Sequence, residues 1–351
     1  MFPKSPDLER IVRDPTPRDR LIDGRVNLRL AFKAKVCRES YVFTRLFMVS
    51  PHVDDRFIRS LYRLVEDYFL RGANTHDDFK NLIKAVNSKL KSLKVKPPPK
   101  IPRYDAKVII PASALKGVVR SRIEYKLSPK ISCYCVEEQK MPPKNLYKRH
   151  LTFWGKEIDK PRGSCSFVKK EEKEKEEKEE EESRKVCIVC DLFGSPGLAS
   201  RIYFSDLEMV SGKVTRLQDL GIEVIAPQSE FKSTVNIINC DLIDLGLLFL
   251  GLELYSGSPI LLGAYKYRYN PSAGGLKYRG NFIFGALRFQ LEDFSETLTN
   301  RLASLLKERP GEVKGGRRIS REDLIKAARL ELEDKLRENV FFDRGVIKVE
   351  C

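Results

Sequence analysis

Cysteine is the residue type whose spacing in this sequence points most directly to chemistry. Cys187 and Cys190 have the C-x-x-C spacing with which two thiolates bind one tetrahedral metal ion. Further thiols and an imidazole lie upstream, so four protein ligands are available. A site with four protein ligands has no open position for catalysis, and we predict a structural Zn²⁺ that stabilises a polar segment. The favoured ligands are Cys135, Cys165, Cys187 and Cys190, with Cys133 or His150 as substitutes.

The eight cysteines of the chain leave other interpretations open. Clustered cysteines in an intracellular chain indicate metal binding more often than disulfides, but intracellular proteins of hyperthermophiles do form disulfides. The alternative to zinc is therefore one disulfide with free thiols, or a set of unrelated buried cysteines. Cys37 and Cys240 lie in apolar patterns, and we expect both in the core.

A glycine-rich, basic stretch at 261–289 has the sequence LLGAYKYRYNPSAGGLKYRGNFIFGALRF. Glycines let the backbone approach a phosphate closely, cations neutralise the phosphate, and tyrosines stack on bases. This combination favours the binding of single-stranded RNA, and a hairpin loop whose tyrosines pack inward is the alternative. The predicted contacts are Lys266, Arg268, Lys277 and Arg279.

The segment 107–127, KVIIPASALKGVVRSRIEYKL, predicts a short strand, a turn and an amphipathic helix. Ser113 is placed to cap this helix. Lys116 and Arg120 are one turn apart and lie mostly off the apolar stripe, as does Arg122. Cations beside a helix N-terminus form a suitable phosphate site. The alternative is a capped amphipathic helix without a ligand.

The composition favours a polyanionic partner. The 351 residues include 65 Lys and Arg against 49 Asp and Glu, a net charge of +16. The run KKEEKEKEEKEEEE at 169–182 is itself acidic, so the rest of the chain is more basic still. Nucleic acid is the usual partner of such a chain, and the lysine-rich surface of a heat-adapted protein is an equal alternative.

The hydropathy pattern favours a cytoplasmic protein without membrane contact. No apolar run reaches the length of a membrane span. The first residues lack the apolar core of a signal peptide, so we expect a soluble, intracellular chain.

The apolar periodicities predict an α+β fold without regular βαβ spacing. Strands are expected at 27–37, 200–210, 245–255, 282–291 and 340–349. Helices are expected at 54–70, 78–93 and 294–306, and from Ser320, which opens a capping box, to about residue 338.

The domain organisation follows from changes in composition along the chain. Residues 1–24 are polar and contain prolines, which predicts an arm or a mobile terminus. Residues 25–351 form one domain with a helical insertion at 50–100 and a Cys-rich, charged insertion at 128–190. The Lys/Glu run inside the second insertion cannot be core, and we expect it to be poorly ordered.

Three motifs in a fixed order carry a resemblance to a known family. They are PASALKGVVR at 111–120, CDLFGSPGLASR at 190–201, and the basic loop at 261–289 that leads into a strand. This order resembles the RAMP superfamily of CRISPR effector proteins, particularly the backbone subunits of type III (Csm/Cmr-like) complexes. The resemblance covers roughly residues 100–290 as spaced motifs.

The resemblance implies a ferredoxin-like, RRM-related core and a guide-RNA-binding subunit of a type III interference complex in antiviral defence. Target RNA and other subunits of the complex are the further partners that it implies. It places the guide-RNA backbone at Ser113, Lys116 and Arg120, and the 261–289 loop as another RNA contact. Arg122 and Arg201 add to the basic surface in this interpretation.

An enzymatic alternative also follows from the resemblance. Some type III backbone subunits cleave target RNA with a divalent metal and an acidic residue in a loop after the first strand. Asp54 and Asp55 are the candidates here, with Mg²⁺ as the cofactor. Both aspartates, like Asp77 and Asp78, lie where a helix N-terminus favours negative charge, and the usual glycine-rich loop is missing. These two observations argue against cleavage.

Other functions find less support in the sequence. It has no P-loop, G-x-S-x-G or H-E-x-x-H motif, which disfavours an ATPase, a serine hydrolase and a zinc protease. A zinc-stabilised basic protein without a CRISPR role is a third interpretation.

Overall fold

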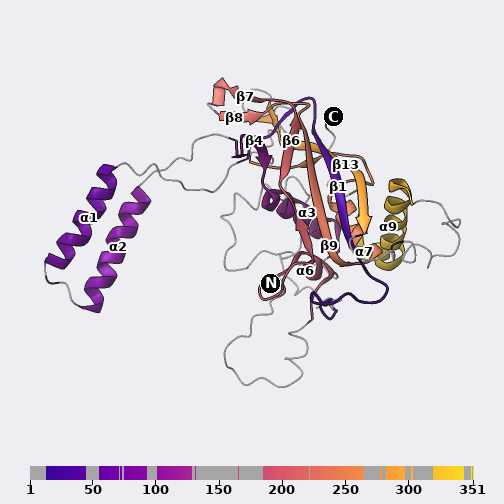
Figure 1. Ribbon diagram of the computed structural model, residues 1–351, viewed down its shortest axis with the longest axis horizontal. Coiled ribbons are helices and arrows are strands. Elements are labelled where there is room, and N and C mark those ends of the chain that lie inside the picture. Colours follow the sequence, from indigo (N-terminus) through magenta and orange to yellow (C-terminus); the bar gives the residue numbers. More distant parts are fainter. Residues whose placement is uncertain are drawn as a thin grey trace, which may run out of the picture. The chain divides into compact units, whose positions relative to one another are not determined.

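The computed structural model divides the chain into two compact units (Figure 1). The main unit comprises Met1–Thr44 and Ile101–Cys351, and the hairpin unit comprises Arg45–Lys100. The structure describes residues 13–44, 55–70, 72, 75–92, 101–128, 131, 165, 185–220, 222–264, 277–278, 282–296, 302, 319–343, 349 and 351.

The main unit is built on a curled antiparallel sheet with the strand order β10-β13-β1-β9-β6-β4-β3, in which β5 also pairs with β9. Two 11-residue strands, β1 and β9, form its centre, and β1 pairs with β9 on one side and β13 on the other. The strands are β1 (Val26–Val36), β3 (Arg103–Tyr104), β4 (Lys107–Ile110), β5 (Ile202–Phe204), β6 (Leu207–Ser211), β9 (Glu230–Cys240), β10 (Ile260–Leu261) and β13 (Ala286–Glu296).

Smaller sheets flank this one. β7 (Val214–Leu217) pairs with β8 (Ile222–Ile225), and the 3-10 turn η2 (Gln218–Leu220) lies between them. β12 (Phe282–Phe284) pairs with β11 (Lys277–Tyr278) and runs parallel to β2 (Ser40–Tyr41).

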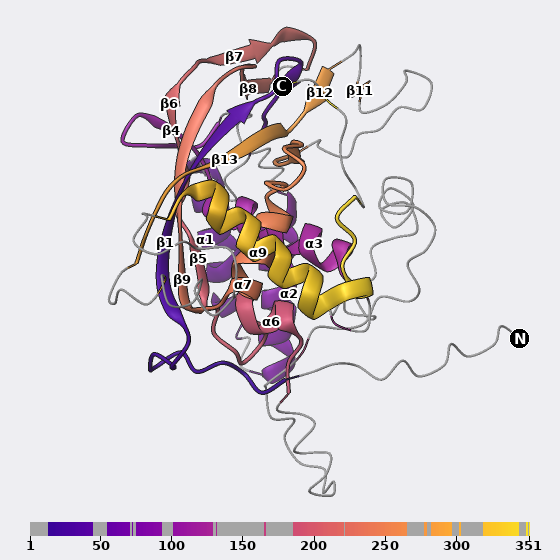
Figure 2. The ribbon, with the colours of Figure 1, turned by 90° about the vertical axis from the view of Figure 1, so that its right-hand side faces the viewer.

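Helices cover one face of the large sheet (Figure 2). They are α3 (Ala112–Lys126), α6 (Ile188–Phe193), α7 (Leu242–Gly251) and α9 (Arg321–Leu336), which is followed by the 3-10 turn η4 (Arg337–Asn339). Every second residue of β1 is buried, because successive side chains of a strand point to opposite faces of the sheet. On the other face, Lys33 of β1 forms an ion pair with Glu230 of β9 at 2.9 Å, so this face of the sheet carries charges of both signs.

The order of the core elements along the chain is β1, α3, β6, β9, α7 and β13, and the sheet arranges these four strands as β13-β1-β9-β6. The α+β class predicted from the periodicities is therefore what the structure shows. Among the described helices, none is long and apolar enough to cross a membrane.

The predicted central strand at 245–255 is wrong, because these residues belong to α7 and the turns that follow it. A helix that is apolar all round has the same unbroken apolar pattern as a fully buried strand. The signal that distinguishes them is the capping box of Asp241 and Asp244, in which each side chain accepts from the other residue's backbone N–H.

Other boundaries also differ from the prediction. Residues 200–210 contain two short strands, β5 and β6, instead of one. The predicted start of the helix at 294–306 is wrong, because β13 continues to Glu296. The strand predicted at 282–291 is divided at Gly285, which has φ +87°, and a Cβ there would lie 2.2 Å from the carbonyl oxygen of Leu262. The strand at 107–110, the helix that follows it and the capping box at Ser320 are confirmed.

The described segments nearest the two ends of the chain are held to the rest of the main unit. The predicted arm is wrong for residues 13–24, since Arg13 forms a β-bridge with Val186 and the backbone N–H of Ile22 donates to Asn239 Oδ1 at 3.0 Å. At the other end, Cys351 forms a disulfide with Cys37, which is fully buried at the end of β1. The core position predicted for Cys37 and Cys240 is confirmed.

The hairpin unit contains α1 (Asp55–Leu70) and α2 (His76–Ser92), which confirms the two predicted helices. Asp78 accepts a hydrogen bond from the backbone N–H of Thr75 at 3.1 Å, and its own N–H donates to Thr75 Oγ1 at 3.2 Å. This reciprocal cap explains the acidic residue at the start of α2.

Candidate nucleic-acid interface and cysteine cluster

The outer side of α3 carries a row of small residues, Ser113, Gly117 and Ser121. All three are exposed, and they lie on one line of the helix because they recur at every fourth position. A Cβ at Gly117 would meet no atom within 4 Å. Glycine in a helix interior costs about 1 kcal/mol relative to alanine, and no packing contact in the described structure requires it here. The row therefore offers a ligand close access to the backbone of α3.

The N-terminus of α3 differs from the prediction. Its N-cap is Pro111, which makes no capping bond, so the cap predicted at Ser113 is wrong. The backbone N–H of Ala112 donates to Asp206 Oδ1 at 2.7 Å. A carboxylate thus already occupies part of the helix end that was predicted to attract a phosphate. The open surface lies one turn further along, at Gly117.

Lys116 lies next to this row and is half-buried. Its Nζ donates to Ser200 Oγ at 2.8 Å and to the carbonyl oxygen of Ile202 at 3.4 Å. Burial, and to a lesser extent the neighbouring Arg120, lowers the pKa of Lys116 below its ordinary value. Both acceptors are neutral, so a phosphate would add the anionic partner that these two bonds do not provide.

Arg120 connects α3 to the turn around α6. Its Nε donates to Glu124 Oε1 at 2.8 Å, and its Nη1 donates to the carbonyl oxygen of Gly194 at 2.7 Å. Its Nη2 donates to Cys190 Sγ at 3.3 Å. The family resemblance implied that Arg120 contacts the guide RNA together with Lys116, but these contacts give Arg120 a structural role within the main unit.

The RNA contacts predicted at Arg122 and Arg201 are wrong, because both side chains are buried. Arg122 is 2% exposed and pairs with Glu253, which also pairs with the buried Lys126 at 2.7 Å. Burial lowers the pKa of Lys126, and the charge of Glu253 opposes this shift. Arg201 donates to Asp244 Oδ2 at 2.8 Å and to Asp244 Oδ1 at 2.9 Å. A buried cation needs such partners, and neither arginine reaches the surface.

Asp191 is the centre of a buried charge network that holds the N-terminal segment. Its carboxylate accepts from Arg13 Nη2 at 2.7 Å, Thr16 Oγ1 at 2.7 Å, Arg18 Nη1 at 3.0 Å and Arg201 Nη2 at 3.1 Å. Burial alone would raise the pKa of Asp191, but the charges of Arg201 and Arg13 and the bonds from Thr16 lower it to about 2. Asp191 thus has a structural role in the main unit.

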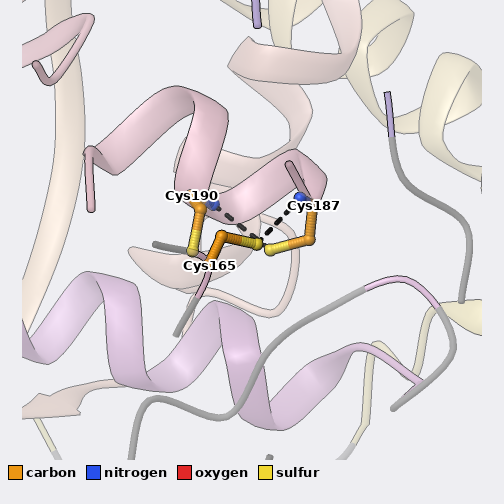
Figure 3. A group of neighbouring side chains, drawn as sticks. All are labelled: Cys165, Cys187 and Cys190. Carbon is orange, nitrogen blue, oxygen red and sulfur yellow. Dashed lines mark hydrogen bonds between the residues drawn. The ribbon is translucent and has the colours of Figure 1, made fainter. Parts of the chain in front are cut away.

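Three cysteines meet beside this network (Figure 3). The Sγ atoms of Cys165, Cys187 and Cys190 all lie within 4.8 Å of one another, and all three residues are buried. Cys187 is the N-cap of α6, and its Sγ accepts from the N–H of Cys190 at 3.4 Å. The N–H of Cys187 donates to Cys165 Sγ at 3.3 Å.

This cluster fits a metal ion. Three soft sulfur ligands converge on one point, which is the donor set that Zn²⁺ and other thiophilic metals prefer. The hydrogen bond with Cys165 is the largest cause that raises the pKa of Cys187 to about 11, and a bound metal would displace this proton. The other predicted ligands, Cys133, Cys135 and His150, lie outside the described residues.

The remaining predicted site residues are described only in part. Of the basic loop, the structure describes the backbone of Lys277 in β11, while Lys266, Arg268 and Arg279 lie outside the described residues. Asp54 also lies outside them, and Asp55 is the first residue of α1.

Sequence reasoning missed two positions that organise the site. Gly117 was visible as a glycine in the interior of a strong helical pattern, which is a signal for close approach. Glu253, the partner of two buried cations of α3, gave no such signal because it lies 131 residues from Arg122.

Comparison with known proteins adds one finding. Residues 94–345 match the family model described as the RAMP superfamily. A search of curated proteins gives no match to the sequence.

Proposed function

Because the family match covers most of its length, the chain belongs to the RAMP superfamily, and from this premise we propose that it is a guide-RNA-binding subunit of a type III CRISPR interference complex. Membership of the family indicates a CRISPR-associated, RNA-binding role. Our proposal adds the type III assignment, guide RNA as the ligand, and target RNA and other subunits as partners. The succession of β1, α3, β6, β9, α7 and β13 supports a ferredoxin-like βαββαβ core.

The observation that carries the proposal is the open backbone of α3 at Gly117 with Lys116 beside it. An RNA backbone is recognised by close approach and positive charge, and both are present here. The phosphates would lie along Ser113, Gly117 and Ser121, with Lys116 as the cation. Such a contact reads no base, so the binding should tolerate different RNA sequences.

The basic loop is the second part of the proposed RNA surface. Lys266, Arg268, Lys277 and Arg279 alternate with tyrosines that suit stacking on unpaired bases. β11 and β12 attach this loop to β2, which follows β1 in the chain.

We also propose that Cys165, Cys187 and Cys190 hold a structural zinc ion, with the fourth ligand supplied by Cys135, Cys133 or His150. Zn²⁺ would link the Cys-rich insertion to α6. Arg120 supports this role because its guanidinium contacts Cys190 Sγ and would offset the negative charge of a metal-bound thiolate.

The test is the binding of single-stranded RNA as a function of salt concentration. For the wild type, we expect the logarithm of the affinity to fall steeply with the logarithm of the salt concentration. Lys116→Glu should weaken binding and make this slope shallower, since each lost phosphate contact removes about 0.7 from it.

The matched control is Lys335→Glu, which reverses an exposed lysine at the end of α9 and should leave both quantities close to those of the wild type. Equal losses in the two variants would mean that only the overall charge matters. An unchanged slope for Lys116→Glu would remove α3 from the RNA surface.

A further inference from the structure

The hairpin unit leaves much of its apolar surface uncovered. Among the side chains of α1 and α2 that the structure describes, at 59–70 and 76–88, Leu82 is the one apolar side chain that is buried, and it remains 8% exposed. Contiguous exposed apolar surface on a protein usually marks an interaction site. The exposed side chains are Tyr62 (72%), Phe69 (61%) and Leu70 (79%) on α1, and Phe79 (58%) and Ile83 (51%) on α2.

These side chains extend the stripes with which the two helices contact each other. Tyr62 and Phe69 are two helical turns apart and therefore lie on one line of α1, and Phe79 and Ile83 are one turn apart on α2. Each apolar stripe is therefore wider than one neighbouring helix can cover. Stripes of this width are buried in bundles of four helices, in which each helix contacts two neighbours.

The charges near the C-terminal end of α1 oppose its helix dipole. Asp55 begins the helix, Arg59 lies in its N-terminal half and Arg63 at its middle. Glu66 and Asp67 lie near the C-terminus, and the last turn has no basic residue. Negative charge at a helix C-terminus and positive charge near its N-terminus both destabilise an isolated helix. The stability of α1 alone therefore does not explain Glu66 and Asp67.

The hairpin as a whole has opposite charges at its two ends. Because α1 and α2 run antiparallel, Glu66 and Asp67 lie at the same end as Asp77 and Asp78 of α2, next to the connection between the helices (Figure 1). Lys80 partly offsets this acidic tip through an ion pair with Asp77 at 3.8 Å. The open end has more basic than acidic residues in the sequence, with Asp55, Arg56 and Arg59 at the start of α1 and Lys89 and Lys91 at the end of α2.

We propose that the hairpin unit is a self-association element, in which the hairpins of two copies of this chain pack antiparallel into a four-helix bundle. A two-fold axis across the helices would place the acidic tip of each hairpin against the basic end of the other. The exposed lines of Tyr62 and Phe69 and of Phe79 and Ile83 would be covered in the same step. This inference goes beyond the RNA-binding proposal and does not depend on it.

The first test is sedimentation velocity of the full chain after removal of bound RNA with nuclease. We expect a concentration-dependent dimer for the wild type. Phe69→Glu combined with Ile83→Glu should give a monomer with unchanged helix content by circular dichroism. The control is Tyr104→Glu, which changes an aromatic residue of the main unit that is 70% exposed and should leave the dimer intact. A monomeric wild type, or a dimer that survives the double substitution, would overturn the proposal.

A charge exchange tests the antiparallel arrangement. Arg56→Glu with Arg59→Glu should raise the dimer Kd by roughly tenfold or more, because acidic residues at the open end would then face the acidic tips. Adding Glu66→Lys and Asp67→Lys should restore the dimer, and this fourfold variant also aligns the charges of α1 with its dipole. Failure of the fourfold variant to dimerise would contradict the proposed arrangement.

Discussion

At the scale of single residues, Gly117 separates stability from RNA binding. Gly117→Ala should raise the free energy of unfolding by up to about 1 kcal/mol, because alanine favours the helix and its Cβ meets no neighbour. Gly117→Gln should also be tolerated by the fold, but its longer side chain would fill the space that the RNA backbone needs. Urea denaturation and RNA titration of both variants measure the two effects.

The control for this pair is Lys335→Gln, an exposed change on α9 that should alter neither quantity by much. If Gly117→Gln bound RNA as tightly as the wild type, the row on α3 would not be a contact surface. Gly117 would then lower the stability of α3 without contributing to RNA binding.

Asp191 is the shared anionic partner of Arg13, Arg18 and Arg201 in the buried network. Asp191→Asn should lower the free energy of unfolding near neutral pH by about 3 kcal/mol, because Arg13 and Arg201 lose an anionic partner. The folded-state pKa of about 2 lies below the ordinary value of about 3.9, so this stabilisation is complete above about pH 4 and is lost as the pH falls toward 2. Denaturant unfolding of the wild type and of Asp191→Asn should show that their difference in free energy of unfolding becomes smaller as the pH falls from about 4 toward 2. A difference that stays constant would contradict the low pKa.

At the scale of elements, prediction succeeded where local signals agree. The segment around α3 combines an apolar run typical of a strand, a proline and a 3.6-residue periodicity, so α3 was predictable. Ser320 and Asp323 form a capping box, which made the start of α9 predictable. α7 was not predicted, because an apolar run has no period and only the box of Asp241 and Asp244 identifies the helix start.

Buried charges limited the prediction of the site in a different way. A cation next to an apolar stripe, such as Arg122 beside Ile123, is normally expected in solvent. Arg122 is buried here because it forms an ion pair with Glu253, which is distant in the sequence. A local sequence pattern does not indicate such a long-range pair. The cysteine cluster was predictable in part, since C-x-x-C spacing is itself a local signal.

If the cysteine cluster at α6 binds a metal ion, the stability of the protein should depend on that metal. The purified protein should contain about one zinc per chain, and a chelator should lower its Tm, because metal binding and folding are coupled. Cys187→Ser should abolish metal binding and lower the Tm of the untreated protein. Elemental analysis and thermal denaturation measure both quantities.

The control for the metal is Cys240→Ser, which changes a buried cysteine that is not part of the cluster. This substitution should lower the Tm without altering the metal content. Retention of zinc by Cys187→Ser would contradict the ligand set.

At the scale of the whole molecule, the two units should be separable. The hydrophobic core of the main unit includes no residue of Arg45–Lys100 among those described. The two ends of this insertion are held close together, because Val42 exchanges backbone hydrogen bonds with Ile225 at 3.1 and 2.8 Å, and the N–H of Ile101 donates to Glu223 Oε2 at 2.8 Å. Glu223 and Ile225 are both in β8, so a short glycine–serine linker can join residue 44 to residue 101.

This deletion variant should keep the fold of the main unit, its cooperative unfolding and its RNA affinity, and it should be monomeric. RNA binding and dimerisation would then belong to different units, because the row on α3 is in the main unit and the exposed apolar side chains are in the hairpin unit. RNA titration and sedimentation velocity on the same preparation test both statements. Loss of RNA binding by a folded deletion variant would show that the hairpin unit is part of the RNA surface, and a dimeric variant would show that self-association uses the main unit.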